Sequence, residues 1–328
     1  MRNFVKAVVA VGILGGISMG VIGASDAAVG RSFASGRYEL ALDGVNAGFA
    51  TAIAGGGAYA DVISEKVGPD KVVHKHLAGV RYEEITLSAG TGMSPAFYGW
   101  IKDSMAGKHT RKNGAVIALD YDGKHVSSLN FSNGLISEIG FPALDATSKD
   151  PARLHVTFAT ESTRRVAGSG GVVTTHETHQ NAKRWLASNF RLRIDGFDLT
   201  RVNKIDAFTL KQKIIESPVG EQRDYQKEPT NIETPNLVIT LPESHADAFY
   251  KWHEDFVIKG NNGQDKEKNG SLEYMAPNLA STYFTLNFKN IGITRIEAID
   301  GSGDSIRRVK VTLYVEQASF DFSKDTGF

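Results

Sequence analysis

The sequence of 328 residues contains no cysteine. This single absence excludes disulfide bonds, thiolate nucleophiles and cysteine-based zinc sites. The chain also lacks an excess of charge of either sign, because 37 basic residues balance 37 acidic ones. A dedicated nucleic-acid binder usually carries a basic excess, so we expect no sequence-specific binding of nucleic acid. A chain without net charge has little long-range self-repulsion, which permits association with copies of itself.

Patterns typical of catalytic or cofactor sites are missing too. His176 and His179 are three positions apart, whereas a zinc-binding helix needs two histidines four apart, so we interpret this segment as a solvated linker. The glycine runs at 55–57 and 168–171 do not join a strand to a helix, as a phosphate-binding loop requires. Glu83 and Glu84 are predicted on a strand, where neighbouring side chains point to opposite faces. We therefore predict no catalytic, cofactor-binding or metal-binding residues, no cofactor, and a protein that is not an enzyme.

One long apolar run is present, at the beginning of the chain. Arg2 and Lys6 precede residues 7–25 (AVVAVGILGGISMGVIGAS), and Asp26, Ala27 and Ala28 follow them. A basic start, an apolar stretch and small residues are typical of a secretory signal peptide, which we predict over residues 1–29 with cleavage after Ala27. A membrane anchor is the alternative, although five glycines weaken such a helix, and a buried segment is a third reading. We expect no membrane span once the signal is removed.

The rest of the chain predicts short strands separated by turns. Asp43-Gly44, Asp122-Gly123 and Asn133-Gly134 are turn pairs of the kind that hairpins favour. A helix is predicted from Pro95 to Gly107 after the capping residue Ser94, and a second over Pro242–Phe256. The predicted strands are residues 37–42, 82–87, 115–119, 154–159, 190–194, 237–241, 283–288 and 309–316.

The two halves of the chain repeat one another. Asp43-Gly44 recurs as Asp195-Gly196, and the aromatic cluster at 97–100 (FYGW) recurs at 249–252 (FYKW), both 152 positions later (195 − 43 and 252 − 100). LNFSN at 129–133 matches LNFKN at 286–290, and VTFATE at 156–161 matches VTLYVE at 311–316. Four matches in one order indicate a tandem duplication, because the small differences in spacing fall in loops. The repeated residues are typical of turns and cores, which points away from an active site.

The first half carries a further order of structural residues. They are a strand ending in RYELALDGV (37–45), then LAGVRYEEITLSAGTGMSPAFYGWI (77–101) and ALDYDGKHVSSLNFSNGLISEIGFPALDA (118–146). In this order the chain resembles the tail tube protein of contractile phages, a family that shares its fold with the tube protein of type VI secretion systems. The matching positions are Gly79, Tyr82, Ile85, Leu87, Trp100, Asp120, Gly123 and Phe131. The second half keeps the Asp-Gly turn, the Trp helix and the LNF strand, but has Thr234-Pro235-Asn236-Leu237 in place of the Gly-x-x-Tyr step.

This resemblance implies a mainly β protein with two tandem tail-tube-like domains. Each would be a small closed antiparallel β-barrel or sandwich with one helix packed on it. We predict a first domain over residues 30–165, a linker over 166–186 and a second domain over 187–328. Residues 54–76 and 208–230 correspond in position to the extended loop of the family.

The same resemblance implies a structural, self-assembling function. Six domains form a ring in this family, so a two-domain chain is expected to form a pseudo-hexameric trimer whose rings stack into a hollow tube. The expected partners are further copies of the chain and sheath, baseplate or capping proteins. An exported monomeric binding or adhesion module of the cell surface is the alternative. With a genuine signal peptide the protein would be periplasmic or extracellular; without it, a virion or cytoplasmic tube is expected.

Overall fold

Most of the described chain consists of antiparallel strands. The computed structural model describes residues 37–66, 68–69, 72–172, 185–218, 224–299 and 306–323. The predicted signal peptide at 1–29 and the histidines at 176 and 179 lie outside these residues. The strands of the first half are β1 (Arg37–Leu42), β2 (Val45–Gly55), β3 (Ala58–Glu65), β4 (His74–Tyr82), β5 (Ile85–Met93), β6 (Lys112–Leu119), β7 (His125–Phe141), β8 (Leu144–Asp145), β9 (Leu154–Ala159) and β10 (Ser162–Ala167). Those of the second half are β11 (Phe190–Ile194), β12 (Lys204–Ile205), β13 (Phe208–Ser217), β14 (Gln226–Glu233), β15 (Leu237–Pro242), β16 (Lys268–Met275), β17 (Thr282–Ile299) and β18 (Arg308–Phe322).

Six strands of the first half close into a barrel. They pair in the order β1-β2-β5-β9-β7-β6, and β6 returns to β1. Side chains alternate along these strands, so Leu40, Leu87 and Phe158 point inward and are fully buried. The predicted fold class, mainly β with barrel-like sheets and flanking helices, is confirmed.

The second half repeats this circuit of strands. Its order, β11-β16-β17-β18-β15-β12, corresponds strand for strand to β1-β6-β7-β9-β5-β2. We call β1–β10 the first repeat and β11–β18 the second repeat. In the described residues β12 pairs with β15 and with β8 but not with β11, so the second circuit stays open where the first one closes. The barrel predicted for each half is therefore closed in the first repeat alone.

Both repeats contribute to one apolar core. The buried residues include Trp100 and Phe158 from the first repeat and Tyr274, Phe284 and Phe320 from the second. Residues 34–328 accordingly form one compact unit. The domain boundaries at 30–165, 166–186 and 187–328 stay predictions.

The two helices differ in regularity. Helix α1 (Pro95–Met105) begins as predicted, because the Ser94 hydroxyl accepts a hydrogen bond from the amide of Ala96 and proline occupies the first helical position. The helix predicted over 242–256 is present, but it differs in its bounds and in its regularity. A 3₁₀ turn (Glu243–His245), α2 (Asp247–His253) and a π turn (Glu254–Ile258) follow one another there. Pro242 still pairs with Arg308 in the sheet, so the α-helix begins only after Ala246.

Two local predictions need correction. Asn133-Gly134 is not a hairpin turn, because β7 runs through it as an irregularity in pairing, with Asn133 at a φ of 50°. The equivalent Asn290 of β17 has a φ of 54°, so asparagine, which tolerates this conformation, marks the same irregularity in both repeats. Glu83 and Glu84 lie between β4 and β5 rather than on a strand, and both are exposed.

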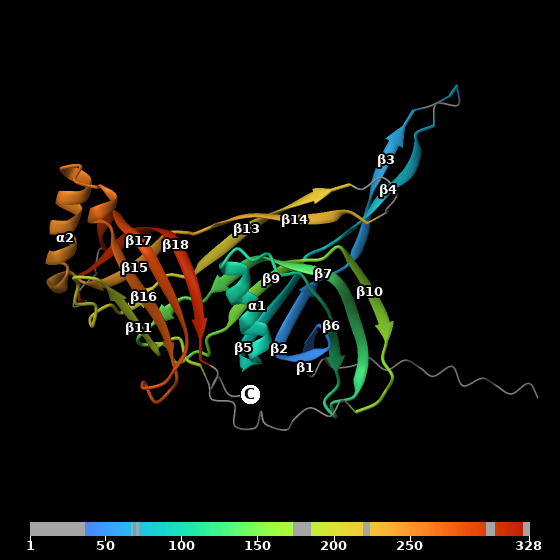
Figure 1. Cartoon of the computed structure of the whole chain (residues 1–328), viewed down its shortest axis with the longest axis horizontal. Coiled ribbons are helices and arrows are strands. Elements are labelled where there is room, and N and C mark those ends of the chain that lie inside the picture. Colours follow the sequence, from blue (N-terminus) through green and yellow to red (C-terminus); the bar gives the residue numbers. More distant parts are fainter. Residues whose placement is uncertain are drawn as a thin grey trace, which may run out of the picture. The chain divides into compact units, whose positions relative to one another are not determined.

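The extended loops predicted at 54–76 and 208–230 are hairpins. Strands β3 and β4 form a separate two-stranded sheet that reaches away from the barrel (Figure 1). Strands β13 and β14 form the matching hairpin of the second repeat. Strand β13 pairs with the barrel strand β7, whereas β3 pairs with no barrel strand of the described chain. The two hairpins therefore have different surroundings.

Candidate functional site: the junction between the repeats

No catalytic or metal site was predicted from the sequence. The candidate functional surface is instead a contact between strands of the two repeats. Within the described ranges no group of three or more His, Asp or Glu side chains could hold a metal ion. No described helix is long and apolar enough to span a bilayer. The contacts between the first repeat and the β13–β14 hairpin, which we call the junction, are therefore the candidate functional site.

The junction is built by backbone pairing. Strand β13 lies antiparallel to the second part of β7, with Phe208 opposite Phe141 and Lys211 opposite Glu138. The rings of Phe141 and Phe208 stack with centroids 5.1 Å apart. The Lys211 ammonium lies 3.0 Å from the Glu138 carboxylate. A strand of one repeat thus extends the sheet of the other, so the edge of β7 beyond its pairing with β6 is covered.

Polar contacts fix the far side of the same hairpin. Arg111 donates a hydrogen bond of 2.8 Å to the carbonyl of Lys227 and forms an ion pair of 2.9 Å with Glu228. The amide of Lys227 donates to Oε1 of Glu161 at 2.9 Å, and the side chain of Asn133 donates to Oε2 of Glu161 at 2.6 Å. The Lys227 side chain is 6% exposed and lies 3.5 Å from Glu216. The pairing of the buried Lys227 side chain favours one position of the hairpin, because an unpaired buried charge is costly.

Helix α1 provides a second contact between the repeats. Tyr98 is 2% exposed and packs against Phe284, Phe320 and Phe322 of β17 and β18, with ring centroids 5.8–6.4 Å apart. Its hydroxyl donates to the carbonyl of Gly90 at 3.2 Å. Burial raises the pKa of Tyr98 well above its usual range, so this phenol stays neutral.

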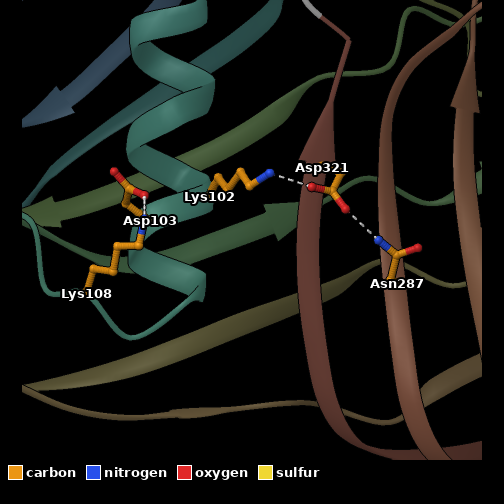
Figure 2. Close-up of polar contacts among 5 residues, drawn as sticks. All are labelled: Lys102, Asp103, Lys108, Asn287 and Asp321. Atoms are coloured by element: carbon orange, nitrogen blue, oxygen red, sulfur yellow. Dashed lines mark hydrogen bonds and ion pairs between the residues drawn. The ribbon is translucent and has the colours of Figure 1, made fainter.

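A polar chain continues along the exposed side of α1. Lys102 of α1 lies 2.6 Å from Oδ1 of Asp321 in β18, whose other oxygen accepts a hydrogen bond of 2.9 Å from Asn287 of β17 (Figure 2). The neighbouring Asp103 pairs instead with Lys108 beyond the same helix (Figure 2). The Lys102 and Asp321 side chains are 49% and 56% exposed, so this pair orients the helix more than it stabilises the fold.

A cavity of about 510 Å³ lies where the two hairpins approach each other. Arg81 of β4 contributes to its wall and lies 3.4 Å from Glu216 of β13. The Tyr82 hydroxyl donates to Asp224 at 3.0 Å. The other lining residues are Tyr59, Glu83, Glu84, Ala159, Ile214 and Lys227. Charged pairs bridge this space, which suits a contact between hairpins better than a reaction pocket.

The sequence reasoning missed the junction residues, although a signal for them exists. Lys112-Asn113-Gly114 of β6 recurs as Lys268-Asn269-Gly270 of β16, which places Glu267 at the position of Arg111. In both repeats the amide of the turn aspartate, Asp43 or Asp195, donates to the carbonyl of the asparagine in this motif. Hydrogen bonds from Lys112 and the amide of Asn113 lower the pKa of Asp43, so this carboxylate is held ionised.

Comparison with known proteins finds a family model that matches the first repeat. Residues 35–164 match the family model of the T4-like virus tail tube protein gp19. Among curated proteins, none matches the chain.

Several solved structures of contractile injection systems are similar. One is the sheath/tube terminator of the PVC extracellular contractile injection system, at 19% identity over 43% of this chain and all of that chain, with a TM-score of 0.37. Another is the tube-terminating cap of the anti-feeding prophage, at 16% identity over 41% of this chain and 89% of that chain, with a TM-score of 0.31. A chain of the PVC sheath–tube complex is similar to the same extent.

The family match covers the closed barrel, α1 and the β3–β4 hairpin. It confirms the resemblance that the order of structural residues predicted for this part of the chain. Residues 35–164 are thus similar to the tail tube protein gp19 of T4-like viruses.

Proposed function

We propose that this protein is a self-assembling subunit whose rings stack into a hollow tube. The junction is the main support for this proposal, because two tube-like repeats are joined there by strand pairing between β13 and β7. Pairing of this kind satisfies strand edges that would otherwise be exposed to indiscriminate association.

The proposed ring contains three chains and six repeats. Each chain already supplies two neighbouring repeats in its own junction. A head-to-tail contact that reproduces this junction between chains closes into a ring when its rotation is suitable. Because 37 basic residues balance 37 acidic ones, copies of the chain do not repel one another through a net charge.

We also propose a non-catalytic role and further structural partners. The recurring residues of the two repeats are turn, core and pairing residues, such as Asp43, Tyr98 and Glu161. Sheath, baseplate and capping proteins are the proposed partners, in keeping with the similar structures, which include a tube-terminating cap, a sheath–tube complex and a baseplate. An extracellular assembly or a virion is the proposed location, and the predicted signal peptide at 1–29 favours export.

Negative-stain electron microscopy with light scattering on the purified chain tests this proposal. We expect particles with the mass of three chains and six lobes around a central hole, with stacks at higher concentration. A uniform monomer at high micromolar concentration would contradict self-assembly and favour the exported binding module instead.

A further inference from the structure

The β3–β4 hairpin is a copy of the hairpin that forms the junction. Tyr59 pairs with Arg81 in the first hairpin, and Lys211 pairs with Glu233 in the second, at positions 152 residues further along (211 − 59 and 233 − 81). The irregularity in pairing also recurs, between Ala60 and Val62 and between Gln212 and Ile214. Every pair of the second hairpin therefore has a counterpart in the first.

Only one of the two hairpins is docked on a barrel strand within the described chain. Strand β13 lies along β7, whereas β3 pairs with β4 alone (Figure 1). The β3–β4 hairpin leaves large apolar side chains exposed: Val62 at 56%, Ile63 at 47% and Leu77 at 71%. Exposure of this kind on a projecting strand is typical of a surface that another chain covers.

The edge that receives a hairpin is also duplicated. On one side, β17 pairs with β18 along its whole length, while on the other its pairing with β16 ends at Ile291. The last part of β17, from Arg295 to Ile299, corresponds to the part of β7 that β13 covers. Ala298 on this edge is exposed, whereas Phe141 at the equivalent place on the covered edge is buried.

The polar residues of the junction recur on the two unoccupied surfaces. Asn290 donates to Glu316 at 2.6 Å, as Asn133 does to Glu161. Glu316 is therefore the counterpart of Glu161, the carboxylate that accepts a hydrogen bond from the hairpin backbone in the junction. Lys75 holds the position of Lys227 in the projecting hairpin.

The polar pair of Arg111 and Glu228 also has a counterpart on the two surfaces. Where Arg111 meets Glu228 in the junction, the second repeat has Glu267 and the projecting hairpin has His76. Oε2 of Glu267 is buried without a hydrogen-bond partner in the described chain. A buried carboxylate oxygen normally has a donor, and a histidine at this place would supply one.

We propose that the β3–β4 hairpin of one chain adds to the exposed edge of β17 in a second copy of this chain, in the arrangement of the β13–β7 pairing. Tyr59 then lies opposite Arg295 and Ala58 opposite Ile296, antiparallel. The amide of Lys75 donates to Glu316, and His76 approaches Glu267. This inference rests on the proposed function and specifies its interface: a head-to-tail contact in which each chain donates a hairpin from its first repeat and receives one on its second.

Engineered disulfides test the arrangement directly, because the chain has no cysteine of its own. Residues opposite each other on antiparallel strands have Cα atoms about 4.5–5.5 Å apart, within reach of a disulfide. The double variant Ala58→Cys with Ile296→Cys, mildly oxidised in the full chain, is expected to give a ladder of covalent multimers that reductant collapses. Leu210→Cys with Ile139→Cys is the matched positive control, because these residues already face each other within one chain. It should oxidise without a change in mass.

Two controls define the register. Each single cysteine variant can give at most a dimer. Ala58→Cys with Lys289→Cys places the second thiol at an exposed position on the same strand but away from the proposed edge, and it should give no ladder. A ladder from this control that equals that of the test pair would overturn the proposed pairing.

The outcome separates this inference from the proposed function. Rings in the microscope without a ladder from the 58–296 pair would leave self-assembly intact and overturn the hairpin contact. Monomers without a ladder would overturn both. As a second measurement, His76→Glu should weaken assembly about fivefold or more, and adding Glu267→Arg should restore it by rebuilding the pair that Arg111 and Glu228 form. Failure of the double variant to recover, with both single variants folded, would contradict the approach of these two residues.

Discussion

The two repeats share their strand order but not their surroundings. Tyr98 on α1 is 2% exposed beneath rings of the second repeat, whereas its counterpart Tyr250 on α2 is 39% exposed. Ile139 on β7 is buried beside β13, whereas its counterpart Ile296 on β17 is only half-buried. Equivalent residues therefore differ in burial because the first repeat has a neighbour in the chain and the second repeat has a free flank. The same sequence feature is core in one place and surface in the other.

The largest predicted effect compares the two tyrosines. Tyr98→Ala removes a ring packed against three phenylalanines and should lower the free energy of unfolding by about 3 kcal/mol, as large-to-small core substitutions do. Tyr250→Ala should change it by less than about 0.5 kcal/mol, because the residue is exposed. Urea unfolding of the chain at low concentration measures both. Equal losses would show that the flank of the second repeat is covered even in the single chain.

The equivalent tryptophans of the two helices, Trp100 and Trp252, give a smaller contrast. The indole N–H of Trp100 donates to the carbonyl of Thr110 at 2.9 Å, whereas the buried N–H of Trp252 has no partner in the described chain. Trp100→Phe should cost about 1 kcal/mol more than Trp252→Phe, because only the first change breaks a hydrogen bond. Thermal unfolding of both variants provides the measurement. A larger loss for Trp252→Phe would refute this ranking.

Hydrogen exchange should reveal how the junction is held. Arg111→Met removes the bond to the Lys227 carbonyl and the ion pair with Glu228, which together contribute about 1 kcal/mol. We expect faster amide exchange in β14 without general unfolding. Lys211→Met is the control, since its ion pair with Glu138 is mostly exposed and is worth less than about 0.5 kcal/mol. Unchanged exchange in the Arg111 variant would show that backbone pairing alone holds the hairpin.

The smallest effect depends on pH. Burial raises the pKa of Glu39 on β1, and one of its carboxylate oxygens has no partner in the described chain. A carboxyl whose pKa is raised by folding favours the folded state below its unfolded pKa and loses that contribution as the pH rises through the folded value. Glu39→Gln should therefore raise the unfolding temperature at pH 7 and have little effect near pH 4. Arg191→Gln, at the equivalent place on the exposed side of β11, should show no such dependence. A stabilisation that is the same at both pH values would exclude titration of Glu39 as its cause.

Short-range patterns predicted many elements correctly. Alternating residues gave β1, β9 and β11 with their observed bounds, and Ser94-Pro95 placed the beginning of α1. These features depend on neighbours in the sequence, so local residues suffice to specify them. The helix predicted over 242–256 begins later than expected because Pro242 is retained in the sheet by its pairing with β18, a contact that no local pattern reports.

The junction required knowledge of long-range pairing. The resemblance implied extended loops at 54–76 and 208–230, whereas the structure has hairpins there. The lysines and glutamates of β13 and β14 are placed by Arg111, Glu138 and Glu161, which come from distant parts of the chain. Contacts of this kind follow from which strand edge is left open, and only the assembled sheet defines that edge.

The sequence by itself determined the duplication, the mainly β class and the tail-tube resemblance, because each is a matter of residue order and periodicity. The tertiary structure decided that the first circuit of strands closes, that the second stays open between β11 and β12, and that one hairpin docks while its copy projects. The reason is physical: residue patterns set which faces of a strand are apolar, whereas the partner of a strand edge depends on what the rest of the fold leaves unpaired.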